Sequence, residues 1–344
     1  MNSEIMIDVR NLNKSFKSSG NVLQMLKGHG EKYVHAINDV SFVIHKGETL
    51  GLVGESGCGK STLSKILTGL YKPDSGKINF RSLGDITAAD KKTLKKICKQ
   101  IQMVFQDPYS SLNPAMTVRQ MFYEILAVHK ICPRKDFEEK TKEILKLAGM
   151  PDGILDRYPD AFSGGQRQRL CIARALILKP ELLIADEPVS ALDMSVQAQI
   201  LNLFSDLKKK MDLTMLFISH DLRVVQYISD RVMVMYLGRI VEMGDTEEIF
   251  QKPGHPYTEL LINSAPSIDD EPDMEENMEC LKETPSPICL PTGCVFHPRC
   301  PYAKEICKRT QPDLIEDTSG RMVRCHFPLL SEADKEMKIG KCAV

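Results

Sequence analysis

The sequence predicts an α/β fold in which helices cover both faces of a mainly parallel sheet. Apolar, strand-like segments alternate with helical ones along much of the chain. A glycine-rich phosphate-loop motif stands between one such strand and the next helix, and another apolar strand ends in two adjacent carboxylates. Because 344 residues exceed what one compact core usually holds, we expect one large domain with an appendage, or two domains.

Charge and composition exclude several classes of protein. With 45 basic and 46 acidic residues, the chain has no basic surplus that would indicate a nucleic-acid partner. No apolar run approaches the roughly 20 residues that span a bilayer, and the start, MNSEIMIDVR, lacks the basic character of a signal peptide. We therefore expect a cytosolic protein. In that reducing compartment, the eleven cysteines should be buried thiols or metal ligands.

The individual elements follow from composition and periodicity. Helical spacing begins at Lys60, and residues 90–160 are mostly helical in pattern. Further helices are expected at 196–210 and 258–265, a loop at 18–32, and an acidic flexible linker at 266–279. The strand-like segments are IMIDVRNL (5–12), DVSFVI (39–44), TLGLV (49–53), ELLIAD (181–186), LTMLFIS (213–219) and RVMVMYLGRIVEMG (231–244).

The segment GESGCGKST matches the phosphate-loop pattern G-x-x-x-x-G-K-[ST], and its strand–loop–helix context supports the match. Its glycines let backbone N–H groups point at phosphate oxygens, and the helix N-terminus adds a positive dipole. Lys60 should reach the β- and γ-phosphates, while the Ser61 hydroxyl should bind Mg²⁺. The predicted nucleotide-binding residues here are Gly54, Glu55, Ser56, Gly57, Cys58, Gly59, Lys60, Ser61 and Thr62.

Two carboxylates, Asp186 and Glu187, end the apolar strand LLIADE. Open α/β sheets bind their ligands at the carboxyl ends of strands. Asp186 should hold Mg²⁺, directly or through water, and Glu187 should act as the general base that activates the attacking water. The chain therefore contains the parts of a nucleoside-triphosphate hydrolase.

The segment FSGGQRQRLCIARAL, residues 162–176, resembles the signature motif of ATP-binding cassette (ABC) ATPases, usually written LSGGQ. Phe162 replaces the leucine. Ser163, Gly164, Gly165 and Gln166 open a helix there, where backbone N–H groups can bind phosphate. The resemblance implies two cassettes packed head to tail, with two ATP molecules between them.

Four other residues match ABC family elements in order. Phe16, in NKSF, matches the aromatic residue that stacks on adenine. Gln106, in MVFQDP, matches the glutamine that contacts the metal and water and couples to the membrane subunits. Asp193 belongs to SALD, which matches the loop at the dimer interface, and His220, in FISHD, matches the histidine that contacts the γ-phosphate.

Longer segments are similar to the ATPase subunits of oligopeptide and dipeptide importers, especially the second of their two ATPase subunits. These segments are MVFQDPYSSLNPAMTV, DEPVSALDMSVQAQILNL and GHPYTELLINSAP. The resemblance implies an ABC ATPase domain at 1–253, with a RecA-like core, an antiparallel β subdomain and a helical subdomain at about 107–165. A small cysteine-rich extension would follow at 254–344.

The same resemblance implies the partners. They are a second ATPase subunit, a paralogue in preference to a second copy, transmembrane permease subunits and, indirectly, an external peptide-binding protein. The chain would lie peripherally on the cytoplasmic face of the cell membrane. Peptide is favoured as the solute, although related importers carry nickel or sugars.

A cysteine cluster lies near the end of the chain. Cys294, Cys300, Cys307 and Cys325 are separated by five, six and seventeen residues, wider than the C-x₂₋₄-C pairs usual in zinc sites. An iron–sulfur cluster suits this spacing better, because its ligands bind different irons. The pattern GCxFxPRCPxAxxxC followed by RCH resembles the C-terminal region of peptide-importer ATPases, some of which carry a [4Fe–4S] cluster. Zn²⁺ or inert buried thiols remain alternatives, and Cys289, His297 or His326 could shift the ligand set.

We therefore expect an ATPase that energises oligopeptide or dipeptide import, with Lys60, Gln106, Glu187 and His220 as its catalytic residues. One rival is a non-transport ABC ATPase acting on nucleic acid or ribosomes, but the chain lacks a second cassette, a coiled-coil insertion and a basic surplus. Another rival is an iron–sulfur redox sensor with a vestigial ATPase. The intact hydrolytic residues argue against it.

Overall fold

The computed structural model of the chain describes residues 4–17, 32–264 and 285–330. The acidic linker predicted at 266–279 lies outside the described residues, and so does nearly all of the loop predicted at 18–32.

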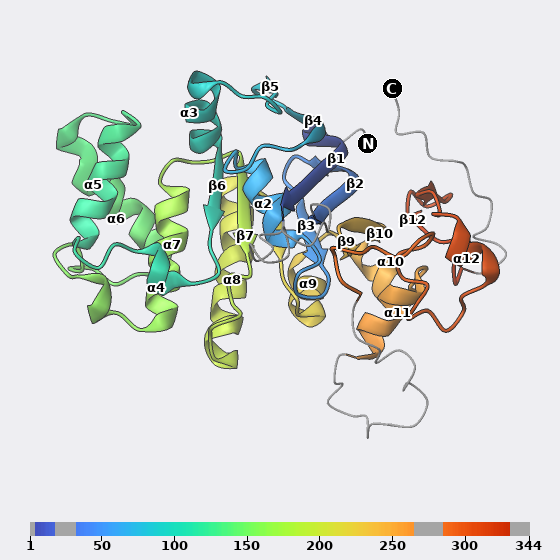
Figure 1. The fold of residues 1–344 in the computed structure, drawn as a ribbon. Coiled ribbons are helices and arrows are strands. Elements are labelled where there is room, and N and C mark those ends of the chain that lie inside the picture. Colours follow the sequence, from blue (N-terminus) through green and yellow to red (C-terminus); the bar gives the residue numbers. More distant parts are fainter. Residues whose placement is uncertain (1–3, 18–31, 265–284, 331–344) are drawn as a thin grey trace, which may run out of the picture.

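The main sheet confirms the predicted α/β class. Its strands are β3 (Thr49–Val53), β6 (Ile101–Val104), β7 (Leu182–Asp186), β8 (Thr214–Ile218), β9 (Arg231–Tyr236), β10 (Arg239–Asp245), β11 (Ile315–Glu316) and β12 (Met322–Val323). In the part of the chain that is described, they form the order β11-β12-β10-β9-β3-β8-β7-β6 (Figure 1). The strands from β9 to β6 in this order run parallel, whereas β10, β12 and β11 are added antiparallel.

The sequence prediction of a mostly helical region at 90–160 was incomplete, because it missed β6. This strand has only four residues and directly follows a helix, so it is too short to show a periodicity of its own. It pairs in parallel with β7 and brings the segment before Gln106 into the main sheet.

Helices and a second sheet sandwich the main sheet, which explains why β3, β7 and β8 are buried along their full length. Alternate residues of β7 enter different cores: Leu182 and Ile184 face one, and Leu183 and Ala185 face the other. The first of these faces is covered by an antiparallel sheet in the order β2-β1-β4-β5 and by two helices. These elements are β1 (Ile5–Lys17), β2 (Tyr33–His45), β4 (Ser75–Phe80), β5 (Gly84–Asp85), α2 (Lys60–Leu67) and α3 (Lys91–Gln100).

The second core lies between the opposite face of the sheet and a run of helices. Several of these helices gather at one end of the molecule, at the left of Figure 1. Local capping sets their starts: Thr117 and Gln120 form a capping box at one helix, and Asp107 caps another. The elements are α4 (Pro108–Ser111), α5 (Val118–Val128), η1 (Arg134–Asp136), α6 (Phe137–Leu147), η2 (Pro159–Ala161), α7 (Gly164–Leu176), α8 (Met194–Met211) and α9 (Leu222–Ile228).

The C-terminal part is joined to the main sheet at its opposite end (Figure 1). It contains α10 (Thr246–Gln251), α11 (Pro256–Asn263), α12 (Glu305–Arg309) and the short strands β11 and β12. Phe296 packs into the same core as the helices. The buried Arg321 donates through Nε to Glu242 Oε1 of β10 at 2.8 Å, so an ion pair also joins the two parts. Cys307 lies in α12.

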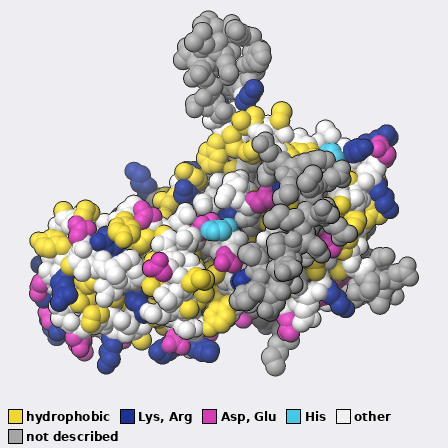
Figure 2. All heavy atoms as spheres, turned by 90° about the horizontal axis from the view of Figure 1, so that it is seen from below, with side chains coloured by type: hydrophobic (Ala, Val, Ile, Leu, Met, Phe, Trp, Pro, Cys, Tyr) yellow, Lys and Arg dark blue, Asp and Glu magenta, His cyan; other side chains and the backbone are white. Residues whose placement is uncertain are grey.

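The described surface carries mixed charge. Over the helical end, at the left of Figure 2, basic and acidic side chains are interspersed with hydrophobic ones. Among the described helices, none is both long enough and apolar enough to cross a membrane.

Candidate nucleotide-binding site

The predicted phosphate loop connects β3 to α2, as expected. Its glycines are required sterically: Gly54 and Gly59 have φ of 154° and 114°, and a Cβ at either would lie 2.2 Å from a backbone carbonyl oxygen, of Met235 or Ala36. The Lys60 ammonium is buried and donates to the carbonyl oxygens of Gly54 (2.6 Å) and Glu55 (3.0 Å). The loop therefore curls around its own lysine.

Ser61 and Asp186, two of the three residues predicted to contact Mg²⁺, lie side by side. The Ser61 hydroxyl donates to Oδ1 of Asp186 at 3.4 Å, and the Ser64 hydroxyl donates to Oδ2 at 3.2 Å. Burial raises the pKa of the Asp186 carboxyl, against the lowering effect of these hydroxyls. A hydroxyl and a carboxylate are the hard oxygen ligands that Mg²⁺ prefers. Sequence reasoning missed Ser64, which lies one helical turn after Ser61.

Two predicted catalytic residues, Gln106 and His220, converge on a carboxylate oxygen of a third, Glu187. Gln106 Nε2 donates to Oε2 of Glu187 at 3.1 Å, and His220 Nδ1 lies 3.1 Å from the same oxygen. Their positions follow from the sheet order, because they stand just beyond the ends of the adjacent parallel strands β6, β7 and β8. Glu187 adopts a left-handed conformation, with φ of 48°, and its side chain is only 14% exposed. Strain of this kind at a site of convergence is typical of functional residues.

The signature motif forms a helix start, as predicted, but its contacts are with another loop. Ser163 and Gln166 form a capping box at the start of α7. A Cβ at Gly165 would lie 2.5 Å from the Val196 side chain, so the signature packs closely against the start of α8. Asp193 is the N-cap residue of that helix. The signature and the SALD loop thus form one surface of this chain.

Phe16, the predicted adenine-stacking residue, lies in β1 opposite Val34. Ala36 lies two residues after Val34 in β2, and its carbonyl oxygen packs against Gly59 of the phosphate loop. The Phe16 ring contacts Tyr71 edge-on, with ring centres 5.4 Å apart. The strand pairing therefore brings Phe16 to the neighbourhood of the phosphate loop.

The four cysteines singled out by the sequence line one cavity, together with His297 and His326. Burial raises the pKa of Cys294, and it raises that of Cys300 to about 12 and that of Cys325 to about 11. In the described part of the chain, no three His, Cys, Asp or Glu side chains form a group that could hold a metal ion.

Two residues of the C-terminal part contact the phosphate loop, and sequence reasoning missed both. The Tyr257 hydroxyl accepts the backbone N–H of Glu55 at 3.0 Å, and Arg299 forms an ion pair with the Glu55 carboxylate. They lie 202 and 244 residues away along the chain, so no local pattern could have indicated them.

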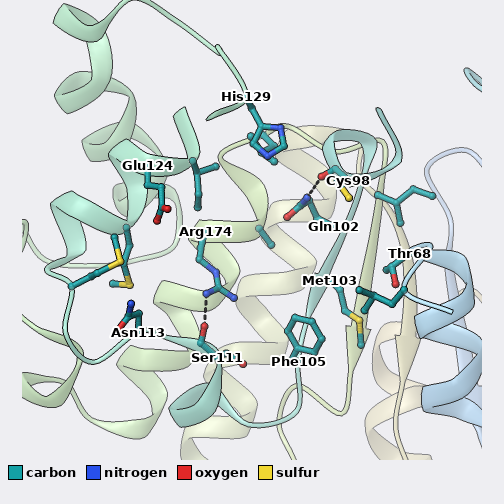
Figure 3. A pocket seen from close by; sticks show the side chains of 17 residues that line it. Thr68, Cys98, Gln102, Met103, Phe105, Ser111, Asn113, Glu124, His129 and Arg174 are labelled. Atoms are coloured by element: carbon teal, nitrogen blue, oxygen red, sulfur yellow. Dashed lines mark hydrogen bonds between the residues drawn. The ribbon is translucent and has the colours of Figure 1, made fainter. Parts of the chain in front are cut away.

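A groove lies between the helical end and the main sheet (Figure 3). Arg174 crosses it and donates to the backbone oxygen of Ser111, and Gln102 donates to the backbone oxygen of Cys98. Phe105, which directly precedes Gln106, is part of the lining and is 38% exposed. A group bound in this groove would touch the segment that leads into the catalytic site.

Two family models match the chain. One, described as ABC transporter, matches residues 37–190, and the other, described as Oligopeptide/dipeptide transporter, C-terminal region, matches residues 241–307. The second match includes Cys294, Cys300 and Cys307 and ends before Cys325.

Two curated proteins are similar over most of their length. The chain is 47% identical to the Oligopeptide transport ATP-binding protein AppF of Bacillus subtilis (strain 168), over 95% of this chain and 98% of that protein. It is 46% identical to the Dipeptide transport ATP-binding protein DppF of Haemophilus influenzae (strain ATCC 51907 / DSM 11121 / KW20 / Rd), over 85% of this chain and 89% of that protein.

Solved structures are similar in fold. The cbiO1 protein of Clostridium perfringens, part of the ABC transporter complex cbiONQ, gives a TM-score of 0.61 at 30% identity, over 72% of this chain and 91% of that one. The ATP-binding cassette MJ0796, in a dimeric post-hydrolysis state bound to ADP and Pi, gives a TM-score of 0.61 at 27% identity, over 70% of this chain and 99% of that one.

Proposed function

The chain belongs to the ATP-binding proteins of oligopeptide and dipeptide ABC transporters, and from this premise we propose how its residues hydrolyse ATP to energise peptide import. One observation carries the proposal: Gln106 and His220 converge on Glu187 at the carboxyl edge of the sheet, where β3 also leads into the phosphate loop. A general base and a phosphate-binding loop at one sheet edge are the parts that phosphoryl transfer to water requires.

In the proposed mechanism the substrate is MgATP. Residues 54–62 bind its phosphates through backbone N–H groups and Lys60, and Phe16 stacks on the adenine. Ser61, Asp186 and Gln106 supply the protein ligands of the substrate's Mg²⁺.

Glu187 accepts a proton from water as the water oxygen attacks the γ-phosphorus. The bond from that phosphorus to the bridging oxygen breaks, which yields ADP and phosphate. His220 holds the Glu187 carboxylate in place, because its Nδ1 faces Oε2 of Glu187. The family resemblance further implies that His220 contacts the γ-phosphate.

A second cassette completes each ATP site in this proposal. Ser163, Gly164, Gly165 and Gln166 bind the ATP held by the partner's phosphate loop, and Asp193 lies at the interface. The close packing of the signature against the start of α8 supports a single contact surface on this chain. The dimeric state of the related MJ0796 cassette also supports it. We favour a paralogous ATPase subunit as the partner, with a second copy as the alternative.

The permease contact is proposed at the groove of Figure 3, with the chain peripheral on the cytoplasmic face of the membrane. Its occupant is a short cytosolic segment of the permease. Phe105 in the lining directly precedes Gln106, so a segment seated there can sense or set the catalytic geometry. The exposed Cys98 thiol also lines the groove. Maleimide should label Cys98 more slowly in the assembled transporter than in the free chain, and equal rates would place the permease elsewhere.

The substitution Glu187→Gln tests the catalytic assignment. Loss of the general base should lower ATP turnover by about a hundredfold or more, while ATP binding is retained. Glu143→Gln is the matched control, because Glu143 lies on α6 in a surface pair with Lys140. Turnover of Glu187→Gln equal to that of Glu143→Gln would remove Glu187 from the role of general base.

We propose that the chain divides into an ATPase domain at 1–253 and an extension at 254–344, and that Cys294, Cys300, Cys307 and Cys325 hold a [4Fe–4S] cluster, although no three of these described side chains stand close enough together in this structure to hold a metal ion. Support comes from the cavity that all four thiols line. When bound, such a cluster supplies a crosslink between loops and a one-electron redox centre. Protein purified without air should be brown and contain iron and sulfide, whereas colourless protein with one zinc per chain would support Zn²⁺.

A further inference from the structure

The cysteine-rich extension reaches the phosphate loop through Arg299. Its guanidinium donates from Nη1 to Oε2 of Glu55 at 3.0 Å, and Nη2 lies 3.0 Å from Oε1. This two-point geometry fixes both carboxylate oxygens. The Arg299 side chain is 8% exposed and that of Glu55 is 27% exposed, so water screens the pair only in part. Because the Glu55 carbonyl also accepts from Lys60, the ion pair ties the extension to the loop that holds the catalytic lysine.

Aromatic rings around Arg299 fix the direction of its guanidinium. Phe296, three residues earlier, packs against Tyr236 and Tyr257 with ring centres 5.3 and 5.4 Å apart. The Arg299 guanidinium carbon lies 5.9 Å from the ring centres of both Tyr236 and Phe296. Tyr257 in turn accepts the Glu55 backbone N–H at 3.0 Å. The backbone and the side chain of Glu55 are therefore both held from the C-terminal part.

The charge of Glu55 makes this contact consequential. Its carboxylate belongs to a loop whose task is to bind a triphosphate, and like charges repel. An uncompensated unit charge beside a bound triphosphate should weaken binding by roughly fivefold to tenfold at the effective dielectric constant of a partly exposed site. The Arg299 guanidinium offsets that charge.

We propose that Arg299 is a positioning residue of the ATP site, through which the cysteine-rich extension sets the affinity of the phosphate loop for ATP. Arg299 acts by neutralising and orienting Glu55, and it does not itself contact the reacting atoms. Since Cys300 is the next residue, any change that unfolds this segment also withdraws the guanidinium from the loop. ATP binding therefore depends on an intact extension. The inference rests on the proposed role of residues 54–62 in binding phosphate.

Binding of a fluorescent ATP analogue with Mg²⁺ to the full chain tests this inference. Arg299→Gln should raise the Kd roughly fivefold to tenfold, and Arg299→Lys, which keeps the charge, should raise it less. In the Glu55→Gln background, adding Arg299→Gln should change the Kd by less than about threefold, because the repelling charge is already gone. Arg309→Gln is the matched control, since Arg309 is 79% exposed and pairs with Glu305 in the same extension.

The double variant Glu55→Gln/Arg299→Gln separates positioning from a merely structural role. If Arg299→Gln weakened binding only by disrupting the extension, it would weaken binding as much in the Glu55→Gln background, and the inference would be overturned. A Kd for Arg299→Gln equal to that of Arg309→Gln would also overturn it. Lys60→Ala distinguishes failure of the phosphate-loop assignment from failure of the inference about Arg299. If it retains full binding, the phosphate-loop assignment fails; if it loses binding while Arg299→Gln does not, only this inference fails.

Discussion

Two regions of the molecule, the carboxyl edge of the parallel strands and the cysteine-rich C-terminal part, are built by different means. At the carboxyl edge of the parallel strands, backbone geometry places each functional group: β6, β7 and β8 carry Gln106, Glu187 and His220 at their ends. In the C-terminal part, α12, β11 and β12 are the only helices and strands among the described residues 285–330. The cysteines meet there through tertiary packing. Sites on helices and strands are held more precisely than sites on loops. This contrast predicts where substitutions do most damage.

The largest effect is expected at the cysteines themselves. Cys307→Ser should remove all visible absorption from anaerobically purified protein, because a cluster needs each of its four thiolates. Cys289→Ser is the control, since Cys289 is exposed in the same extension and does not line the cavity. Loss of absorption in Cys289→Ser, with retention in Cys307→Ser, would show that a shifted ligand set is correct.

Replacing Gly293, which directly precedes Cys294, should give the next largest effect, a decrease in the free energy of unfolding. Gly293 has φ of 68°, and a Cβ there would lie 2.4 Å from the backbone oxygen of Cys307. Gly293→Ala should therefore destabilise the protein by about 3 kcal/mol, from backbone strain and from the clash. Gly153→Ala, with φ of 76° and open space around it, should cost about 1 kcal/mol. Denaturant titration measures both, and equal losses would show that the extension accommodates the methyl group.

A pH dependence at the start of α11 is the effect that is smallest near neutral pH. Burial lowers the pKa of His255 to about 3 from its ordinary 6.5, and its Nδ1 accepts the Tyr257 N–H at 3.0 Å. Because the unfolded chain binds a proton below about pH 6.5 and the folded chain does not, stability should fall as the pH drops from 6.5 towards 3.

His255→Asn tests this contribution. An asparagine oxygen can still accept the Tyr257 N–H as a helix cap but cannot take up a proton. The free energy of unfolding should therefore fall less steeply with decreasing pH in His255→Asn than in wild type. Equal slopes in the two proteins would assign the pH dependence to other groups.

The elements that carry the predicted nucleotide site lie where the sequence placed them, because each is a short contiguous pattern. The phosphate loop, the strand LLIADE and the helix start at Ser163 have local conformations that their own residues dictate, namely glycines, apolar runs and caps. The sheet class followed from the alternation of strands and helices. The strand β6 was missed because four residues show no period, and Ser64 because a serine inside a helix carries no sign of its partner.

The sequence by itself determined that this chain is an ABC-type ATPase with a cysteine-rich end, because those signals reside in neighbouring residues. Only the tertiary structure decided that this end touches the phosphate loop. The contact between Arg299 and Glu55 joins residues 244 positions apart, and the four thiols line one cavity only after the chain has folded. The physical reason is that backbone conformation is set locally, whereas pairing of buried charges and thiols is set by the packing of distant segments.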